Sequence, residues 1–551
     1  MRESNVFGSL TPALSQRERE NNKTTSRLRE RCPMRITRLM LLGFAMLSLW
    51  AVAQVAEAQV RRPNILLIYA DDQSYKTVGC YPESWPWVRT PNIDALAKTG
   101  VRFQGAYLGS WCMPSRATLL TGRHPHGIES MRMEGTYPGS TYDPKQTPFW
   151  PSVFRKQGYH TAQIGKWHTG TDPGFGRDWD YQIVWNRPRH PDNAGNYYDK
   201  QMLSFNGGEP KLVEGYSTDN YTKWACEYIR GEHRAADKPW YLWLCYGAVH
   251  GPSIPAKRHL GSYKDGKVPS PADIFGPRPG KPAYLDKTQA WVKGPDGLPV
   301  TGKSGEAFGD ESSKKAKTHA EWVHQVNECV PAIDEGVGQV MAALRESGQL
   351  ENTLVIYTAD QGFSMGEHGF RTKLAPYDAN YRSPLIVSRP GTIPQGKVCQ
   401  HTVNGTDLVV TFFKHVGLEL PWTMHGRDIS PLLLNPESTE WSHPTLYEHV
   451  GHDYGSDVTK VLRGEPSHAE HNNVPWYVAL HHGQKKYIRY LAPNVDPPEE
   501  LYDLAADPEE LTNLAARPDQ RATLERLRQT AISELRRTES RFLDHLPPVA
   551  R

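Results

Sequence analysis

The sequence contains few cysteines and no strong excess of charge of either sign. Its 551 residues include seven cysteines, and none of them has the C-x-x-C or cysteine–histidine spacing that zinc sites use. Lysine and arginine number 64 and aspartate and glutamate 61, so the formal net charge is only +3. This near-balance argues against a nucleic-acid-binding protein and against charge-driven binding to a membrane surface. The absence of internal repeats argues against a solenoid or propeller.

No apolar run is long enough to span a membrane comfortably, but one has the pattern of a signal peptide. Residues 34–58 begin with a basic stretch, continue with an apolar run over 39–53 and end at an A-x-A cleavage site. We expect this segment to be a secretory signal peptide, with an uncleaved membrane anchor as the alternative. The protein would then be exported, periplasmic or secreted, without stable membrane insertion once the signal is removed. In that environment one disulfide is possible, although the sequence does not pair the cysteines.

The first 33 residues are polar and charged, unlike a signal peptide. We therefore expect translation to begin at Met34, and residues 1–33 to be a wrongly assigned upstream segment. The length of the remaining chain predicts one large domain and one smaller domain. We place them at residues 62–434 and 441–545.

Short apolar runs that end in polar residues predict an α/β sheet. Continuous apolar runs of this kind are typical of strands buried on both faces. They occur at residues 64–70, 160–164, 240–247, 353–359 and 383–388. Helices are predicted between them, at 91–98, 319–347 and 408–416. The smaller domain is predicted to hold antiparallel strands at 476–480 and 486–491 and a final helix over 519–542.

One long segment, residues 251–317, is rich in proline, glycine and lysine and shows little periodicity. A loop of this length inside a compact domain is usually functional or poorly ordered. We expect an insertion near the mouth of the functional site. The segment either contacts substrate there or is a poorly ordered loop.

Polar side chains follow several of the predicted strands directly. Asp71 and Asp72 follow the first run, and Asp360 and Gln361 follow the run at 353–359. In open α/β sheets ligands bind beyond the carboxyl ends of the strands, so these residues can converge although they are far apart in sequence. Three carboxylates and an amide oxygen form a set that suits a hard divalent cation, calcium in preference to magnesium. The alternative for each acidic pair is a helix cap or a loop.

Cys112 lies at the start of a short predicted helix. Pro114 suits the first helical turn, because its missing N–H would have no partner there. Gly122 after two leucines predicts a left-handed cap that ends the helix. The backbone N–H groups at the start of a helix favour an anion, and Arg116, one turn along, can point back to the same place. The alternative is a buried structural cysteine.

Residues 112–122 read CMPSRATLLTG and resemble the C-x-P-S-R-x-x-x-L-T-G signature of the formylglycine-dependent sulfatases of the alkaline-phosphatase-like superfamily. The resemblance extends over roughly residues 62–514. It implies an α/β fold with a large, mixed, mostly parallel sheet sandwiched by helices, and a smaller C-terminal α+β subdomain with an antiparallel sheet. It also implies that a formylglycine-generating maturation enzyme oxidises Cys112 to an aldehyde, whose hydrate is the nucleophile.

The same resemblance assigns the remaining site residues. Calcium would be bound by Asp71, Asp72, Asp360, Gln361 and the oxidised Cys112. The family usually has asparagine or histidine at the last of the four strand-end positions, so Gln361 is a departure.

Basic residues are assigned in the same way. Lys166 and His168 lie in a segment that resembles the family's G-K-W-H motif, and His250 resembles its sulfate-binding histidine. Lys373 resembles the sulfate-contacting lysine, with Arg371 as a rival. Arg116 belongs to the signature itself.

These assignments predict a mechanism for cleaving a sulfate ester. One hydroxyl of the aldehyde hydrate attacks sulfur, and His250 or Lys373 protonates the departing alcohol. His168 then removes the proton of the second hydroxyl, so that the aldehyde re-forms and sulfate leaves. A serine would be trapped as a sulfate ester. We expect a sulfated carbohydrate as substrate.

Two other functions remain open at this point. One is a phosphatase or phosphodiesterase of the same superfamily. The other is a non-catalytic binder of sulfated glycans in which Cys112 is never matured. His124 and His126, after the signature helix, either face the substrate or pack. His468, His471, His481 and His482 are predicted to lie on the surface.

Overall fold

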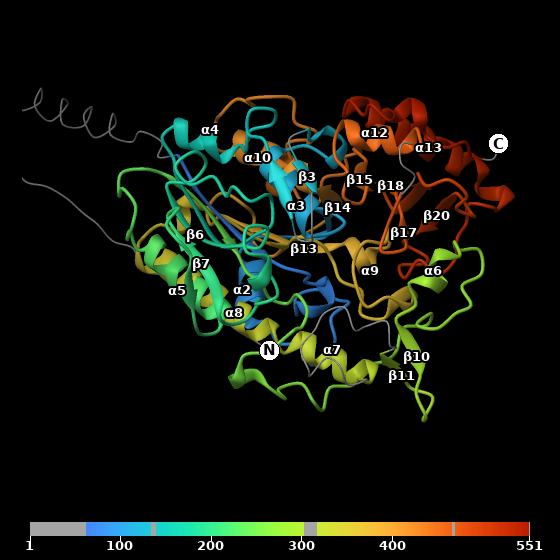
Figure 1. The fold of residues 1–551 in the computed structure, drawn as a ribbon, viewed down its shortest axis with the longest axis horizontal. Helices are drawn as coiled ribbons and strands as arrows, with labels where there is room; N and C mark the ends of the chain where they lie inside the picture. The colour runs from blue at the N-terminus through green and yellow to red at the C-terminus, as the bar shows by residue number, and fades with distance from the viewer. Residues whose placement is uncertain (1–61, 130, 134–138, 302–316, 465–468, 550–551) are drawn as a thin grey trace, which may run out of the picture. The chain divides into compact units, whose positions relative to one another are not determined.

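The computed structural model describes residues 62–129, 131–133, 139–301, 317–464 and 469–549 (Figure 1). The predicted upstream segment and signal peptide lie outside these residues. Within the described ranges, no helix is both long and apolar enough to cross a lipid bilayer. All six cysteines in the described part of the chain are free thiols, so no disulfide forms there.

A ten-stranded mixed sheet organises the larger part of the chain. Its strand order is β14-β2-β13-β12-β1-β9-β5-β6-β7-β8. The strands are β1 (Asn64–Ala70), β2 (Val101–Tyr107), β5 (His160–Trp167), β6 (Tyr181–Asn186), β7 (Gln201–Phe205), β8 (Lys211–Val213), β9 (Trp240–Cys245), β12 (Thr353–Ala359), β13 (Ser383–Ser388) and β14 (Lys397–Asn404). The five central strands from β12 to β6 are parallel, and antiparallel pairs lie toward the edges. The predicted α/β class and mixed, mostly parallel sheet are confirmed.

The register of the central strands brings the polar strand ends together. Ala70 at the end of β1 pairs with Ala359 at the end of β12, and Tyr69 pairs with Cys245 at the end of β9. The acidic residues that follow β1 and β12 therefore leave the sheet side by side. All seven residues of β1 and all seven of β12 are buried, which explains why the sequence shows continuous apolar runs there.

Helices cover both faces of the sheet (Figure 1). One face packs against α3 (Cys112–Thr121), α4 (Pro151–Lys156) and α10 (Gly405–His415). The other packs against α2 (Pro91–Lys98), α5 (Ser217–Ile229) and α8 (Val330–Glu346). Alternate residues of β1 belong to the two cores, which is the two-sided burial expected of a parallel sheet.

The helix predicted over 319–347 is two helices. α7 (His319–Asn327) opens with a capping box in which Thr318 and Glu321 cap each other, and α8 begins at Val330. Pro331 lies in the first turn of α8 and has no N–H to continue a helix from α7. The apolar spacing runs through both helices because both pack on the same face, so periodicity alone did not reveal the break.

The segment 251–317 is partly structured. It holds the short helix α6 (Tyr284–Lys287) and a hairpin of β10 (Trp291–Lys293) and β11 (Pro299–Thr301), while 302–316 lie outside the described residues. Both ends of the segment reach the pocket described below, through Gly251–Ser253 and through Thr301 and Lys317. The insertion therefore does lie beside the site.

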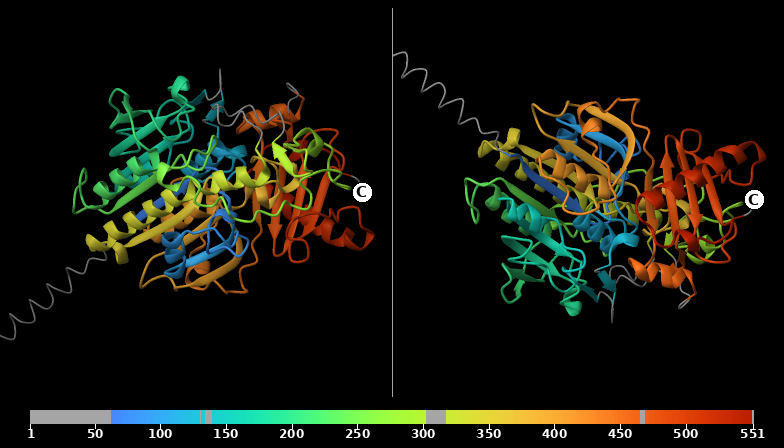
Figure 2. Two further views of the ribbon diagram at one scale, coloured as in Figure 1. Left: turned by 90° about the horizontal axis from the view of Figure 1, so that it is seen from below. Right: turned by 90° about the horizontal axis from the view of Figure 1, so that it is seen from above.

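The C-terminal part contains a four-stranded antiparallel sheet, shown in red in Figure 2. Its strands are β15 (Thr445–His449), β18 (Tyr477–His482), β19 (Lys485–Tyr490) and β20 (Glu499–Asp503). One face packs against α13 (Arg521–Arg537) in a core of its own. Tyr477, Ile488 and Tyr502 on the other face join the core of the large sheet. The predicted antiparallel subdomain is confirmed, and its boundary at 434–441 stays a prediction.

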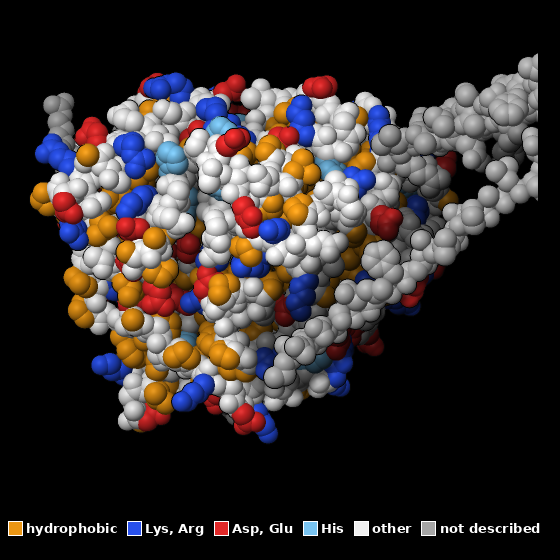
Figure 3. Space-filling model, turned by 180° about the vertical axis from the view of Figure 1, so that it is seen from behind, with side chains coloured by type: hydrophobic (Ala, Val, Ile, Leu, Met, Phe, Trp, Pro, Cys, Tyr) orange, Lys and Arg blue, Asp and Glu red, His pale blue; other side chains and the backbone are white. Residues whose placement is uncertain are grey.

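Charged side chains are mixed on the surface. On the face seen in Figure 3, lysine and arginine alternate with aspartate and glutamate rather than gathering into one patch. This agrees with the near-balance of charge in the sequence.

Candidate active site

Cys112 is the first residue of α3 and is buried, with 1% of its surface exposed. The helix ends as predicted at Gly122, whose left-handed conformation (φ 70°) lets its N–H donate to the carbonyl of Thr118 at 2.8 Å. Burial, and then the nearby Asp71, raise the pKa of the Cys112 thiol to about 11. The unmodified side chain is therefore a neutral thiol at neutral pH and a poor nucleophile.

Three buried carboxylates lie beside Cys112. Asp71 and Asp72 follow β1, Asp360 follows β12, and all three residues are at most 2% exposed. The N–H of Asp72 donates to Oδ1 of Asp360 at 2.9 Å, which joins the two strand ends directly. Asp72 has a positive φ of 58°, a conformation that costs energy in a residue other than glycine and is often found at functional sites. The convergence of the two acidic pairs is thus present in the fold.

Three cations pair with these carboxylates. Lys166, near the end of β5, contacts Asp71. Arg116 donates to Asp360 Oδ2 at 3.1 Å and to the carbonyl of Lys166 at 3.2 Å, so it does point back from the helix to the strand ends. The Nζ atom of Lys373 lies 2.5 Å from Asp72 Oδ1 and 3.0 Å from the sulfur of Cys112.

The three carboxylates do not ionise alike. Burial would raise the pKa of Asp71, but Lys166, His250 and Arg116 hold it well below its usual range. Burial and then the charge of Asp71 raise the pKa of Asp360 to about 8. Burial also raises the pKa of Asp72, against the opposing effect of Lys373. Burial and mutual repulsion therefore make it costly to ionise all three carboxylates together, even with a basic side chain paired to each.

The donor set fits a hard metal ion. Asp71 Oδ1 and Gln361 Oε1 are buried oxygens without a hydrogen-bond partner in the described part of the chain. Ligand atoms of Asp71, Cys112 and Asp360 all lie within 4.8 Å of one another, as do those of Asp72, Cys112 and His250. Buried oxygens without partners are costly unless a cation or water satisfies them. The predicted cation-binding residues are brought together, and Gln361 is among them through its contact with Asp72.

His250 stands at one edge of this cluster. The loop after β9 is tied to Asp71, whose carbonyl accepts from the N–H of Val249 at 2.8 Å. This places His250 Nε2 3.6 Å from Asp72 Oδ2 and 3.0 Å from the hydroxyl of Tyr197. Burial and then Lys373 hold the pKa of His250 well below its ordinary value, so the ring is neutral at neutral pH.

His168 lies close to the start of α3. Its ring centroid is 6.0 Å from that of Trp111, the residue before Cys112, and Nη1 of Arg187 lies 3.2 Å from each ring nitrogen, so that it can donate to whichever one is unprotonated. Burial and then Arg187 hold the pKa of His168 well below its ordinary value. A neutral imidazole in this place can accept a proton.

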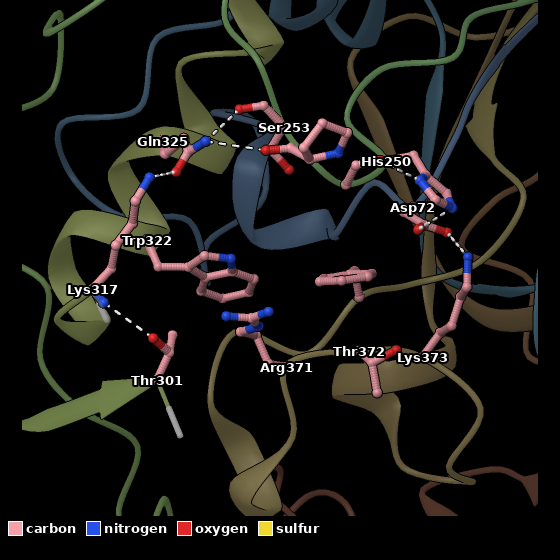
Figure 4. Close-up of a pocket in the computed structure, with 13 residues that line it drawn as sticks. Asp72, His250, Ser253, Thr301, Lys317, Trp322, Gln325, Arg371, Thr372 and Lys373 are labelled. Carbon is pink, nitrogen blue, oxygen red and sulfur yellow. Dashed lines mark hydrogen bonds and ion pairs between the residues drawn. The ribbon is translucent and has the colours of Figure 1, made fainter. Parts of the chain in front are cut away.

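A pocket opens beside the cluster (Figure 4). Asp72, His250 and Lys373 line one side of it, while Arg371 lies on the other side with its guanidinium 5.9 Å from the ring of Trp322. Of the two residues that the sequence left as rivals, Lys373 contacts Cys112 and Asp72, and Arg371 lies beside Trp322.

The C-terminal part supplies neighbours that the sequence did not indicate. The rings of His452 and His471 lie 5.3 and 5.1 Å from that of Trp111, and their Nε2 atoms are 3.0 Å apart. His471 and His482 are half-buried and His481 is buried, so the prediction that they are surface residues is wrong, while His468 lies outside the described residues. The sequence gave no sign that His471 would lie near Trp111, because this contact forms only when β16 (Glu470–His471) packs close to the start of α3 in the folded chain.

His124 and His126 pack rather than line the pocket. His126 is buried and contacts Glu448 at 2.8 Å and the carbonyl of Thr538 at 3.0 Å. The rings of His124 and His425 lie 5.7 and 5.1 Å from that of His126. These histidines join the end of α3 to the C-terminal part and are structural.

This cluster predicts a loss of stability in acid. Burial, together with neighbouring histidine and arginine side chains, holds the pKa values of His124 and His425 well below 6.5. The unfolded chain then binds more protons than the folded one, so stability falls as the pH drops below about 6.5, by up to about 1.4 kcal/mol per pH unit for each histidine. His425→Asn keeps an acceptor for the N–H of His124 and should flatten the fall between about pH 7 and 5 in thermal unfolding. An unchanged slope would contradict this account.

The chain is similar in sequence to known sulfatases. A family model described as Sulfatase matches residues 63–418, and one described as N-sulphoglucosamine sulphohydrolase, C-terminal, matches 366–538. The chain is 29% identical over 456 residues to an N-acetylglucosamine-6-O-sulfatase of Bacteroides thetaiotaomicron, covering 74% of this chain and 78% of that protein. It is 26% identical over 433 residues to the human N-acetylglucosamine-6-sulfatase, covering 76% and 72%.

Solved structures share the fold. One, in complex with its substrate D-glucosamine-2-N,6-O-disulfate, superposes with a TM-score of 0.72 at 24% identity and covers 88% of this chain and 99% of its own. A phosphonate monoester hydrolase of Agrobacterium radiobacter gives a TM-score of 0.63 at 23% identity, covering 87% and 96%. At these identities the likeness is one of fold.

Proposed function

The chain belongs to the sulfatase family of the alkaline-phosphatase-like superfamily and is a sulfatase, and on that basis we propose that it removes sulfate from a carbohydrate at the pocket beside Cys112. One observation carries the assignment of the site. Cys112 lies at a buried helix start, 3.0 Å from Lys373 and beside the carboxylates that follow β1 and β12. The relatives named as N-acetylglucosamine-6-sulfatases support an amino sugar sulfated at its 6-position as the substrate class.

We assign Cys112 to conversion into formylglycine by a maturation enzyme. As a neutral thiol with a pKa of about 11, the unmodified side chain is poorly suited to attack sulfur. An aldehyde hydrate at this position supplies an oxygen nucleophile that needs no thiolate. Export from the cytoplasm is part of the same proposal, in keeping with the apolar run at 39–53.

A divalent cation, with calcium as the first choice, completes the site. Asp71, Asp72, Asp360 and Gln361 would hold it together with the oxidised side chain at position 112. When bound, the ion supplies positive charge next to the sulfate oxygens and balances the carboxylates.

The chain's own residues orient and neutralise the sulfate group. Lys166 and Lys373 place positive charge near position 112, and the N–H groups at the start of α3 add to it. Arg116 is bound to Asp360 and to the carbonyl of Lys166, so it acts by fixing those groups rather than by reaching substrate.

Proton transfer falls to the histidines and Lys373. His168 is neutral and next to Trp111, so it is suited to take the proton of the second hydroxyl at position 112. His250 and Lys373 both line the pocket, and because the ring of His250 is neutral while Lys373 holds its proton, Lys373 is the better placed of the two to protonate the departing alcohol. Tyr197 stacks on His250 with ring centroids 3.9 Å apart and so holds the His250 ring beside Asp72.

Turnover of an aryl sulfate against the matching aryl phosphate tests the reaction. The shared fold of the phosphonate monoester hydrolases makes phosphorus esters the principal competing substrates. We expect the sulfate ester to be preferred, and a preference for the phosphorus ester would reverse the assignment. A non-catalytic binder would turn over neither ester and would keep an unshifted thiol at position 112 in mass spectrometry.

Separate removal of the two basic residues on one segment distinguishes their roles. Lys373→Ala should lower kcat/KM for an aryl sulfate by roughly 10²-fold or more, because Lys373 contacts both position 112 and Asp72. Arg371→Ala should lower kcat/KM by less than about 10-fold, because the guanidinium of Arg371 lies beside Trp322 and not at position 112. Steady-state kinetics of the two variants measure this, and the reverse order would give the sulfate-contacting role to Arg371.

A further inference from the structure

A second, larger cleft joins the active-site pocket. His250, Gly251 and Pro252 line both. The pocket beside Cys112 has a volume of about 70 Å³, whereas the adjoining cleft has about 1030 Å³. Pockets that bind small ligands are typically about 300–1,000 Å³. The pocket can therefore admit the sulfate ester itself, while the cleft has room for several sugar rings.

Most of the charged residues that line the cleft are basic. Four are cationic, Arg187, Lys200, Lys257 and Arg258, and one is acidic, Asp199. Arg258 is neutralised outside the cleft by Asp219 at 2.7 Å and Glu335 at 2.6 Å.

The two lysines differ from Arg258. Both are exposed, and neither forms an ion pair with any carboxylate in the part of the chain that the structure describes. Asp199 accepts the N–H groups of Lys200 and Gly215, both at 2.8 Å, so its charge is engaged by backbone. The cleft as a whole favours an anionic occupant.

The wall of the cleft also offers flat apolar surface. Tyr216 donates its hydroxyl to the carbonyl of Ile254 at 3.0 Å, and Ile254 itself is 39% exposed. These two side chains form a surface of the kind that packs against the apolar face of a sugar ring.

The cleft is fastened to the catalytic histidines. Tyr198, in its lining, donates to the carbonyl of His250 at 2.5 Å. Arg187, only 4% exposed, also lines the cleft and donates to His168 at 3.2 Å. An occupant of the cleft would therefore be held in a fixed relation to the pocket.

We propose that this cleft binds the continuation of the substrate chain, at least one further sugar that carries its own anionic group next to Lys200 and Lys257. This rests on the proposed sulfatase activity and names its substrate as an anionic oligosaccharide or polysaccharide rather than a free monosaccharide. The sulfate that is cleaved occupies the pocket, and the anions of the continuing chain remain in the cleft.

The test uses Lys200→Ala/Lys257→Ala in the mature enzyme, with Lys264→Ala as a matched control. Lys264 is an exposed lysine in the segment 251–317, which also contains Lys257, and it lines neither the pocket nor the cleft. The substrates are an aryl sulfate, a sulfated monosaccharide, and tetrasaccharides with one sulfate or with several. The double variant should lower kcat/KM for the multiply sulfated tetrasaccharide by about 10-fold and change that for the aryl sulfate by less than about 2-fold. The control should change neither.

Three outcomes would overturn the inference. They are an equal fall for all substrates, no fall for any, and a wild-type enzyme that handles the monosaccharide as well as the multiply sulfated tetrasaccharide. Binding of that tetrasaccharide to the Cys112→Ser protein, with and without the two lysine substitutions, is measured by calorimetry. If binding depends on the two lysines but the wild-type protein turns over no sulfate ester, the proposed binding role of the cleft would stand. The proposed sulfatase activity would then be refuted.

Discussion

Replacement of Cys112 by serine is expected to lower kcat for sulfate esters by roughly 10³-fold or more. The substitution removes the group that would be oxidised, and a serine hydroxyl sulfated in the first step has no second hydroxyl from which His168 can take a proton. The fold should survive, because serine has nearly the volume of cysteine and Cys112 lies at a helix start, where a hydroxyl is tolerated. Steady-state kinetics and thermal unfolding of the variant measure the two effects.

Cys399→Ser is the matched control. Cys399 is equally buried but lies in β14, away from the carboxylates, so its replacement should leave kcat unchanged within about 2-fold. Mass spectrometry of the wild-type peptide that contains position 112 should give a mass about 18 Da below that of the cysteine form. Appreciable activity in Cys112→Ser would remove the proposed mechanism, and an unshifted peptide in fully active enzyme would remove the proposed modification.

Removal of the divalent cation is expected to lower both activity and stability. Asp71, Asp72 and Asp360 are buried within a few ångströms of one another, and a bound ion relieves their repulsion. A ligand that binds only the folded state, present at about 1,000 times its Kd, stabilises by about 4 kcal/mol, so its removal should lower Tm by several degrees. Activity should fall by at least about 10²-fold. Thermal unfolding and aryl sulfate kinetics before and after chelation test this.

Restoration separates the effect of the ion from that of the chelator. Calcium should restore Tm and activity at lower concentration than magnesium, because the oxygen set is large and includes an amide. Gln361→Ala should raise the calcium concentration needed for half-restoration by about 10-fold or more, since Gln361 Oε1 is one of the buried oxygens without a protein partner in the described chain. A metal-free protein of unchanged Tm and activity would refute the metal site.

Much of the site could be predicted because its residues lie next to strongly patterned segments. The limits of β1, β12, β13 and α2 match the apolar runs and helix signals of the sequence. Parallel strands end at one edge of a sheet, so Asp71 and Asp360 could be expected to meet. Residues 112–122 give both the helix limits and the family, because signature residues and the glycine cap fall within one short segment.

Other parts depend on contacts that no local pattern records. The choice of Lys373 over Arg371 for the contact with Cys112 is made by the path of the loop after β12, since both side chains are long and basic. Arg187 and Tyr197 follow β6 and come to lie beside His168 and His250, the two proposed catalytic histidines, only in the folded chain. The apolar spacing of the sequence did not reveal the break between α7 and α8, because both helices pack against the same face of the large sheet.

The sequence by itself determined the fold class, the position of the proposed nucleophile and the acidic residues at the strand ends, because these follow from short-range patterning and from one contiguous motif. Only the tertiary structure decided which cations neutralise which carboxylates and that histidines of the C-terminal part pack against Trp111. It alone also decided that a cationic cleft continues from the pocket. Those features join residues that are tens to hundreds of positions apart, and the packing of the whole chain fixes their distances.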